Sequence, residues 1–293
     1  MTIRQELSSC EYYHVDSFTT ERFQGNPAGV ILARELPPEE TMLRIAGELQ
    51  LESAFAAPSD SNEYDYDVVY CTGVTRIPLC GHDTIALGAV LAQRGELPVG
   101  GALRIQTDVG VLILEHGEEG WIRMSQAPPS FGESTDPDPL ADVLGIDSTM
   151  LVGLPPQVVS TGTPFLIAAV QDQTVLDALG EGTERLAEFL AALPGNPVGL
   201  YCWAQSDLTL NAGEIRTRCF CPGAGLPEDP ATGSASGAFG AYLVKHSLAE
   251  PGTISIWQGN RQTRTGRLRV ECDGERVGVS GQGTIFARGE LWV

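Results

Sequence analysis

The sequence is poor in basic residues and has no long apolar run. Lys and Arg total 18 against 38 Asp and Glu, which gives a formal net charge of -20. Such a surface repels phosphate backbones and anionic lipid, so we expect no nucleic acid and no membrane among the partners. No apolar run approaches the roughly 18 residues of a membrane span, and residues 1–18 hold no continuous apolar core of a signal peptide. We therefore expect a cytoplasmic protein.

Signatures of nucleotide and metal binding are also missing. No Gly-x-Gly-x-x-Gly follows an expected strand, and no phosphate-binding loop with Lys followed by Ser or Thr occurs. Cys219 and Cys221 form a Cys-x-Cys, but no second Cys or His pair stands at zinc-finger spacing. The sequence therefore predicts no cofactor and no metal. The seven cysteines are an odd number in a chain long enough not to need disulfides, which favours a reducing compartment.

Short runs of alternating or β-branched residues predict many strands with few helices between them. The expected strands are 12–17, 28–33, 66–71, 103–107, 109–115, 121–125, 157–161, 165–170, 198–204, 253–257, 267–272 and 276–280. The expected helices are about 38–50, 82–95, 139–145, 174–179 and 182–193. Because many strands follow one another without a crossover helix, we expect an α+β fold with mainly antiparallel sheet.

A proline-rich segment divides the chain. Residues 126–139 hold four prolines and no periodicity, so we interpret them as a linker between two halves. The N-terminal half is predicted to comprise residues 1–126 plus about 283–293, and the C-terminal half residues 127–282.

The two halves look like copies of one unit. Gly81–Arg94 and Gly233–His246 lie 152 positions apart and share five of 14 residues. A weaker similarity relates residues 26–33 to residues 163–170, each with a proline near its start. Chance likeness between two Ala- and Gly-rich helices is the alternative, but both segments lie near the middle of their half, which favours duplication.

Each repeated helix is small and apolar on almost every side, which is typical of a buried helix. Glycine costs up to about 1 kcal/mol inside a helix, so Gly88, Gly237 and Gly240 indicate that something approaches the backbone closely. We expect each half to wrap a sheet around its own helix. Two such halves would place both helix N-termini at a cleft between them.

Side chains at the start of the first repeated helix could carry chemistry. Glu52 follows an expected helix and precedes a small apolar stretch; it is either a solvated loop residue or, in a closed apolar site, a carboxylate able to move protons. His82, next to Gly81, could donate to an anion or move a proton, or it could be merely hydrogen-bonded. Cys80 could be a base or a buried core residue.

The start of the second repeated helix offers a different set. Residues 229–234 read Asp-Pro-Ala-Thr-Gly-Ser, and their N–H groups with Ser234 could hold an anion, although a simple helix cap is the alternative. Asp16 and Asn26, near the N-terminus, stand in what by themselves are an ordinary strand and turn.

Taken together, these segments resemble the PhzF-like (phenazine biosynthesis-like) family of the diaminopimelate epimerase and proline racemase superfamily. The resemblance covers nearly the whole chain. The segments that carry it are VDSFTTERFQGNPAGVIL at 15–32, LESAF at 51–55, PLCGHDTIALGAVL at 78–91, STGTPFLI at 160–167 and RCFCPGAGLPEDPATGSASGAFGAYL at 218–243.

The resemblance implies two pseudo-symmetric halves, each a curved sheet around a central helix, with the active site between them. It implies a cofactor-independent isomerase that transfers a proton on a small carboxylate-bearing substrate, with Glu52 as the proton shuttle. It also implies a homodimer. The implied catalytic residues are Glu52, His82 and Asp229, and the implied substrate-binding residues are Asp16, Asn26, Gly81, Asp83, Gly233 and Ser234.

Two alternatives stay open. Racemases of the superfamily use two cysteines; Cys80 matches the first, but the second half has Asp229 followed by Pro230 and no thiol. An epimerase or dehydratase that depends on Cys80 is one alternative, and a protein that binds a small acid without turnover is the other. Asp83 departs from the family pattern, which has a small or apolar residue there. A second carboxylate beside His82 would favour protonated imidazole or reject a substrate carboxylate.

Overall fold

The computed structural model describes residues 9–209, 213–260 and 262–293. Their contacts form two compact units. Unit 1 runs to Met124 and resumes at Gly281, and unit 2 comprises Ser125–Ser280. The divisions therefore fall after residues 124 and 280.

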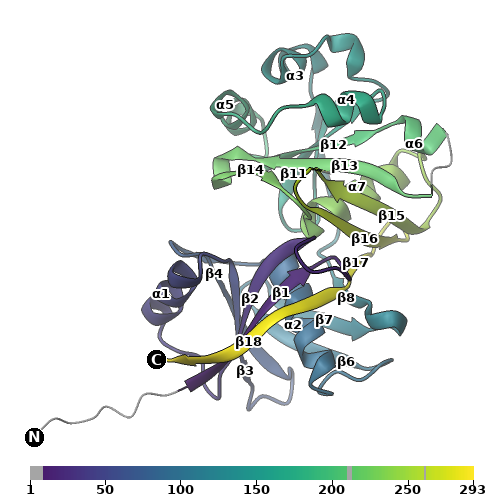
Figure 1. Cartoon of the computed structure of the whole chain (residues 1–293). Coiled ribbons are helices and arrows are strands. Elements are labelled where there is room, and N and C mark those ends of the chain that lie inside the picture. Colours follow the sequence, from purple (N-terminus) through teal and green to yellow (C-terminus); the bar gives the residue numbers. More distant parts are fainter. Residues whose placement is uncertain (1–8, 210–212, 261) are drawn as a thin grey trace, which may run out of the picture. The chain divides into compact units, whose positions relative to one another are not determined.

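Unit 1 is a mixed, mainly antiparallel sheet. Its strands pair in the order β18–β1–β2–β3–β4–β6–β7–β8 (Figure 1). Strand β5 is added beside β4. The pairs β2–β3 and β4–β6 are parallel, and the other pairs are antiparallel. The strands are β1 Ser9–Ser17, β2 Asn26–Leu32, β3 Ser53–Pro58, β4 Tyr66–Cys71, β5 Arg76–Ile77, β6 Ala102–Thr107, β7 Gly110–His116, β8 Ile122–Ser125 and β18 Gly283–Trp292, with a 3-10 turn at Glu118–Gly120.

Helix α2, Gly81–Gln93, is the central helix of unit 1 and packs on β1, β2, β3, β7 and β18. Eight of its residues are buried, as its uniformly small and apolar sequence predicts. At Gly88 a Cβ atom would lie 2.4 Å from Ile122 Cγ2, so the strand approaches the helix as closely as only glycine permits. Helix α1, Glu39–Leu49, covers the opposite face of β2–β4 through Met42 and Ala46.

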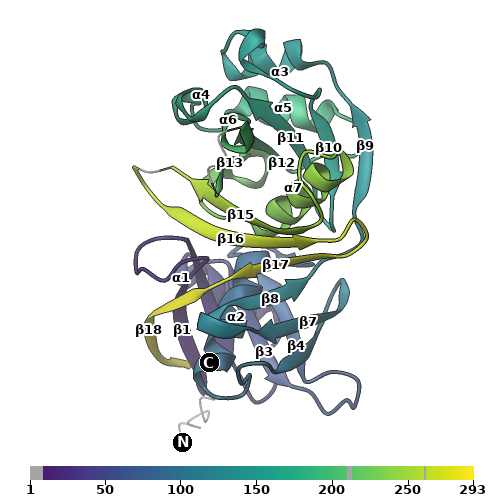
Figure 2. The ribbon, with the colours of Figure 1, turned by 90° about the vertical axis from the view of Figure 1, so that its right-hand side faces the viewer.

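Unit 2 repeats this plan. Its strands pair in the order β9–β10–β11–β12–β13–β15–β16–β17, with β14 added beside β13 (Figure 2). Here β11–β12 and β13–β15 are the parallel pairs. The strands are β9 Ser130–Ser134, β10 Gln157–Ser160, β11 Pro164–Val170, β12 Gly199–Ala204, β13 Ile215–Cys221, β14 Leu226–Asp229, β15 Gly252–Gly259, β16 Thr265–Cys272 and β17 Val277–Gly281.

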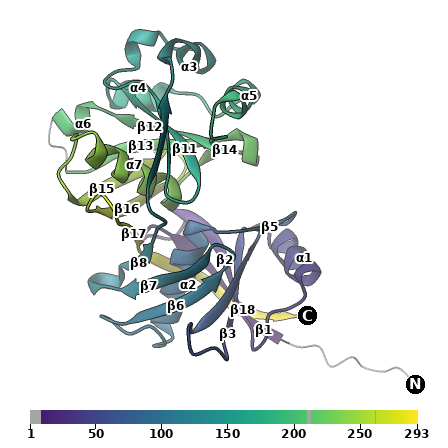
Figure 3. The same ribbon diagram turned by 180° about the vertical axis from the view of Figure 1, so that it is seen from behind.

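Helix α7, Gly233–Lys245, is the central helix of unit 2 and packs on β10, β11 and β16. A Cβ atom at Gly240 would lie 2.4 Å from Val270 Cγ1. The other face of the sheet is covered by outer helices, which Figure 3 shows grouped at β11 and β12. These helices are α3 Pro137–Leu144, α4 Gln173–Ala178 and α5 Glu184–Ala192; the unit also holds α6 Ser206–Thr209 and 3-10 turns at Ser148–Met150 and Pro222–Ala224.

The two units thus have the same order of parallel and antiparallel pairs and the same place for the central helix. The segments whose sequences look alike occupy matching positions: α2 corresponds to α7, and β2 corresponds to β11. Both central helices have 13 residues. The predicted α+β class and the two pseudo-symmetric halves are confirmed.

Several elements were missed by the sequence analysis. The segment 126–139, interpreted as a linker between the halves, contains strand β9, which pairs with β10 and was not predicted. Strand β3 was missed because Ser53–Pro58 holds mostly small residues of low strand propensity, although five of its six residues are buried. Strand β13 was missed because two arginines interrupt its apolar pattern, yet all seven of its residues are buried.

All seven cysteines are buried and unbridged. Within residues 9–209, 213–260 and 262–293, no helix combines the length and the apolar character that crossing a membrane would take.

Candidate active site

The start of α2 is held in place by both neighbouring strands of the sheet. Glu52 lies between α1 and β3, and its carbonyl accepts a hydrogen bond from the Gly29 amide of β2 at 2.9 Å. The Ser17 hydroxyl of β1 donates to the His82 carbonyl at 2.7 Å. Because the backbones of Glu52 and His82 are both tied to the sheet, their side chains start from fixed positions.

Four side chains meet there, and we call Glu52, Cys80, His82 and Asp83 the α2 cluster. The Cys80 thiol donates to Glu52 Oε2 at 3.3 Å, and its sulfur lies 3.3 Å from His82 Nδ1. His82 Nε2 lies 3.6 Å from Glu52 Oε2 and 3.4 Å from Asp83 Oδ1. The structure therefore brings together three of the predicted site residues and adds Cys80 to them.

Burial in the α2 cluster is uneven. The side chains of Asp83 and His82 are 0% and 12% exposed, whereas that of Glu52 is 30% exposed. Neither carboxylate oxygen of Asp83 accepts a hydrogen bond from the described residues. Glu52 is therefore the acidic group of the cluster that a small molecule could reach, and Asp83 lies behind it.

The ionisation of the buried members follows from this burial. Desolvation raises the pKa of Asp83 to about 7; the nearby His82 charge opposes this shift, and the Glu52 charge adds to it. Desolvation also raises the pKa of Cys80 well above its usual value, and the negative charges of Asp83 and Glu52 act in the same direction. Cys80 is thus a neutral thiol at neutral pH, which suits a hydrogen-bond donor better than a base.

The start of α7 holds a closed hydrogen-bond network. Asp229, which is 8% exposed at the end of β14, accepts a hydrogen bond from the Thr232 hydroxyl. The Gln258 amide donates to the Asp229 carbonyl and to the Thr232 hydroxyl, both at 2.8 Å, and its oxygen accepts from the Thr232 amide at 3.0 Å. Gln258 was not predicted from the sequence, because a single glutamine in a strand carries no distinctive pattern.

The remaining predicted residues of unit 2, Gly233 and Ser234, lie in the first turn of α7. Gly233 is buried at the first position of α7, and the carbonyl of Ser234 accepts from the Thr161 hydroxyl at 3.3 Å. The same hydroxyl donates a hydrogen bond to Gln126 Oε1 at 3.2 Å. Gln126 Nε2 is buried without a hydrogen-bond partner among the described residues. Thr161 belongs to the STGTP segment, which is part of the family resemblance, whereas Gln126 belongs to the predicted linker. The sequence therefore offers a reason to consider Thr161 but none to consider Gln126.

Neither central helix is capped by a side chain. Cys80 before α2 and Thr232 before α7 make no capping hydrogen bond, and the same holds for Pro38 before α1. By contrast, Asp136, Asp172 and Thr183 cap α3, α4 and α5. Amide groups at an uncapped helix start can bind an anion, and the helix dipole favours one there.

The predicted residues Asp16 and Asn26 lie in β1 and β2, two of the strands that pack on α2. Asp16 is 1% exposed, and its Oδ2 accepts from the Phe23 amide at 2.8 Å, which orders the loop between the two strands. Asn26 is 6% exposed and lies opposite Ser17 in the β1–β2 register. Gly81 is the first residue of α2. Ser17 itself, which holds the helix start, was quoted as part of a motif but was not predicted as a site residue.

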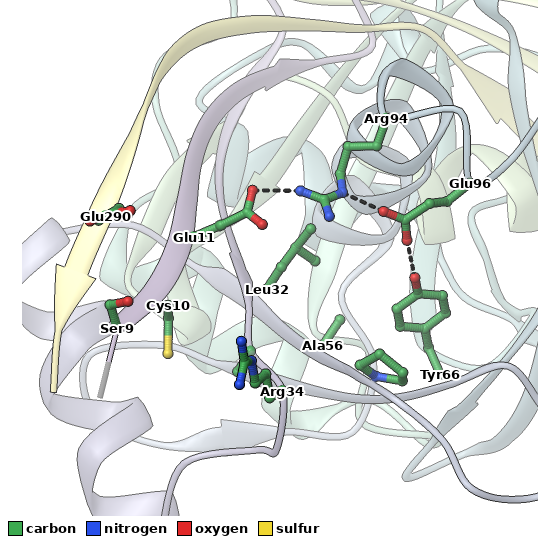
Figure 4. A pocket seen from close by; sticks show the side chains of 12 residues that line it. Ser9, Cys10, Glu11, Leu32, Arg34, Ala56, Tyr66, Arg94, Glu96 and Glu290 are labelled. Atoms are coloured by element: carbon green, nitrogen blue, oxygen red, sulfur yellow. Dashed lines mark hydrogen bonds and ion pairs between the residues drawn. The ribbon is translucent and has the colours of Figure 1, made fainter. Parts of the chain in front are cut away.

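A separate cavity of about 370 Å³ in unit 1 contains none of the predicted site residues. Two arginines, Arg34 and Arg94, line it. Figure 4 shows Arg94 hydrogen-bonded to Glu11 and Glu96, and Glu96 in turn hydrogen-bonded to Tyr66.

Comparison with known proteins links the whole chain to one group. Residues 15–289 match the family model described as phenazine biosynthesis-like protein. An uncharacterized isomerase of Clostridium acetobutylicum is 31% identical over 95% of this chain and 97% of its own. The trans-2,3-dihydro-3-hydroxyanthranilate isomerase of Pseudomonas aeruginosa is 29% identical over 96% of this chain and 99% of its own.

Solved structures support the fold. A phenazine biosynthesis protein of the PhzF family from Bacillus anthracis is 26% identical, with a TM-score of 0.84 over 98% of this chain and 100% of its own. A hydroxyproline epimerase from Agrobacterium vitis shares only the fold, at 11% identity and a TM-score of 0.64 over 100% of this chain and 94% of its own.

Proposed function

The chain belongs to the phenazine biosynthesis-like (PhzF) protein family, and we propose that it is an isomerase that moves a proton between two carbons of a small carboxylate-bearing substrate. The observation that carries this proposal is the Glu52 carboxylate, which is partly exposed while the acidic group behind it is buried. Two relatives named as isomerases match this chain over nearly the whole length of both proteins. The proposed reaction needs no cofactor, because one carboxylate can remove and return the proton.

Glu52 takes the proton from one substrate carbon and returns it to another. Its Oε2 receives a hydrogen bond from the Cys80 thiol and lies 3.6 Å from His82 Nε2, so the carboxylate is held in one orientation. A positioned carboxylate of this kind contributes about 10²–10⁴-fold to a proton transfer. Negative charge that develops on the substrate is stabilised by the amide groups at the uncapped start of α2.

Cys80 is assigned the role of orienting Glu52 rather than of a second base. A buried thiol whose pKa is raised well above its usual value is a poor proton acceptor at neutral pH. The geometry therefore favours the isomerase over the Cys80-dependent epimerase or dehydratase. His82, Asp229 and Ser234 are proposed to position the substrate, which rests on their match to the family motifs.

The substrate class follows from the same groups. The Pseudomonas aeruginosa relative is named for trans-2,3-dihydro-3-hydroxyanthranilate, which makes this compound the first one to test. Asp83, buried beside His82, would repel a substrate carboxylate placed next to it whenever Asp83 is charged. We therefore propose a small carboxylate whose acidic group is held away from Asp83.

Solvent isotope exchange tests the role of Glu52. The protein is incubated in D₂O with trans-2,3-dihydro-3-hydroxyanthranilate and with a panel of small cyclic and amino-acid-like carboxylates, and deuterium incorporation is followed by mass spectrometry. We expect exchange with at least one compound, and a loss of about 10²–10⁴-fold in Glu52→Gln.

Glu48→Gln is the matched control, because Glu48 is exposed on α1 four positions away in the sequence. It should exchange at the wild-type rate. Equal rates in Glu52→Gln and wild type would remove Glu52 from the mechanism. Saturable binding without any exchange would instead support a small-acid binding protein.

A further inference from the structure

The α2 cluster combines the donor atoms that borderline-soft metal ions prefer. It offers one sulfur, one imidazole nitrogen and two carboxylates, and one ligand atom from each of these lies within 4.8 Å of all the others. Ions such as Mg²⁺ and Ca²⁺ select six or more oxygen ligands. A mixed set of thiolate, imidazole and carboxylate is instead typical of Zn²⁺.

The distances within the α2 cluster suit a tetrahedral ion. Zinc bonds of about 2.0–2.3 Å at tetrahedral angles place neighbouring donor atoms roughly 3.3–3.7 Å apart. Oε2 of Glu52 lies 3.3 Å from Cys80 Sγ and 3.6 Å from His82 Nε2. Nε2 lies 3.4 Å from Asp83 Oδ1 and 3.8 Å from Cys80 Sγ. Small side-chain rotations would therefore suffice to surround a zinc ion.

Asp83 gives an independent reason to expect a ligand. Its side chain is completely buried, it points toward His82, and neither of its oxygens accepts a hydrogen bond from the described residues. Buried polar groups nearly always have hydrogen-bond partners, so this carboxylate, whose one cationic neighbour among the described residues is His82, has acceptor oxygens left for a ligand. The cluster is also reachable, because the Glu52 side chain is 30% exposed.

We propose that the α2 cluster is a binding site for Zn²⁺, and that the bound ion blocks the proton transfer. On binding, the Cys80 thiol releases its proton to solvent and its sulfur bonds to the metal, while the carboxylates and His82 displace water from the ion. Glu52 then has an oxygen engaged by the metal and cannot accept a proton from substrate. The block of proton transfer rests on the proposed function, whereas the binding of Zn²⁺ does not.

Cobalt spectroscopy tests the site without any substrate. Chelator-treated, reduced protein is titrated with Co²⁺, which replaces Zn²⁺ and reports thiolate ligation by a charge-transfer band in the near ultraviolet. We expect one equivalent of Co²⁺ to produce this band together with the visible bands of a tetrahedral ion. Zn²⁺ should displace the Co²⁺ and abolish both.

Three variants locate the ion. Cys80→Ser should lose the charge-transfer band, and Asp83→Asn should weaken Co²⁺ binding by roughly 10- to 100-fold or more. Cys219→Ser is the control, because Cys219 and Cys221 are a pair of neighbouring thiols outside the α2 cluster, with sulfurs 3.7 Å apart. It should keep the band. No band in wild type, or a band that survives in Cys80→Ser, would overturn the site.

Isotope exchange separates the site from the function. With an exchanging substrate, one equivalent of Zn²⁺ should stop deuterium incorporation, and excess chelator should restore it. Exchange that proceeds unchanged in Zn²⁺-loaded protein would overturn the block while leaving the spectroscopic site intact. Glu52-dependent exchange in a protein with no cobalt spectrum would leave the proposed function standing and remove the metal.

Discussion

The starts of α2 and α7 are the same backbone feature in two copies, yet their side chains differ in kind. Cys80, His82 and Asp83 correspond along the repeat to Thr232, Ser234 and Ala235. At α2, buried ionisable groups face one another and Asp83 has no hydrogen bond from the described residues. At α7, Asp229, Thr232 and Gln258 satisfy one another.

The two helix starts therefore share a backbone arrangement but differ in the chemistry of their side chains. Duplication supplied two buried helices of equal length, each starting without a side-chain cap. Among the described residues, the start of α2 brings four ionisable side chains together, which is the usual condition of catalytic groups. At the start of α7 the one carboxylate, Asp229, accepts a hydrogen bond from the neutral Thr232, and this network is suited to holding a ligand in place.

The largest expected effect concerns Asp83, the fully buried carboxylate of the α2 cluster. The pKa of Asp83 is raised to about 7 in the folded protein from its ordinary value of 3.8, so the folded state holds this proton more tightly than the unfolded state. Stability from this group is therefore full at acidic pH and is lost as pH rises from about 4 to about 7. Asp83→Asn should make the protein more stable at pH 8, by up to about 4 kcal/mol.

Urea unfolding at pH 4.5 and pH 8 in the presence of chelator measures this difference. The gain of Asp83→Asn over wild type should be large at pH 8 and small at pH 4.5. Asp60→Asn, which changes an exposed carboxylate of the same unit, should show no such dependence. An equal gain at both values would mean that the buried charge is not the cause.

The next effect tests whether the two scaffolds are equivalent. Gly88→Ala and Gly240→Ala each place a Cβ 2.4 Å from a strand side chain, Ile122 and Val270 respectively. Each should destabilise its unit by about 1–3 kcal/mol, in spite of the higher helix propensity of alanine. Thermal and urea unfolding measure both.

A rescue variant shows whether the contact is the cause. Gly240→Ala combined with Val270→Ala should be more stable than Gly240→Ala alone, because the shortened side chain makes room for the new methyl group. A loss in one unit only would contradict the equivalence of the two helix positions.

The smallest effect concerns the thiol. Cys80→Ser keeps a hydrogen-bond donor toward Glu52, so isotope exchange should fall by less than about tenfold, which corresponds to about 1.4 kcal/mol. Cys272→Ser, a buried thiol outside the α2 cluster, should have no effect on exchange. Complete loss of exchange in Cys80→Ser would restore the alternative in which this cysteine is a base.

The sequence predicted the repeated part of the fold well. The likeness of 81–94 to 233–246 corresponds to the two central helices, and that of 26–33 to 163–170 corresponds to β2 and β11. Strands β3 and β13 were not predicted, because strand propensity describes exposed and half-buried strands and these two are almost entirely buried. In β13, Arg218 is satisfied by Glu228 and by the carbonyls of Leu176 and Leu179, which no local pattern reveals.

The prediction of the candidate site depended more on the resemblance to the family than on the spacing of its residues in the sequence. By spacing alone Glu52 reads as a loop residue, because its neighbours Cys80 and His82 are nearly 30 positions away in the sequence. The parallel pairing of β2 with β3 brings Glu52 to the start of α2. Side chains such as Gln258 act through tertiary contacts only, so they could not be found before the strands were placed.

The last strand has a consequence for how the protein is made. Residues 283–292 form β18, which pairs along the whole of β1. Unit 2 is one continuous segment and has all its strands once Ser280 has been synthesised. Unit 1, although it begins first, lacks the neighbour of its opening strand until β18 has been synthesised, after the whole of unit 2. On the ribosome, the half that carries Glu52 is therefore the later one to be completed.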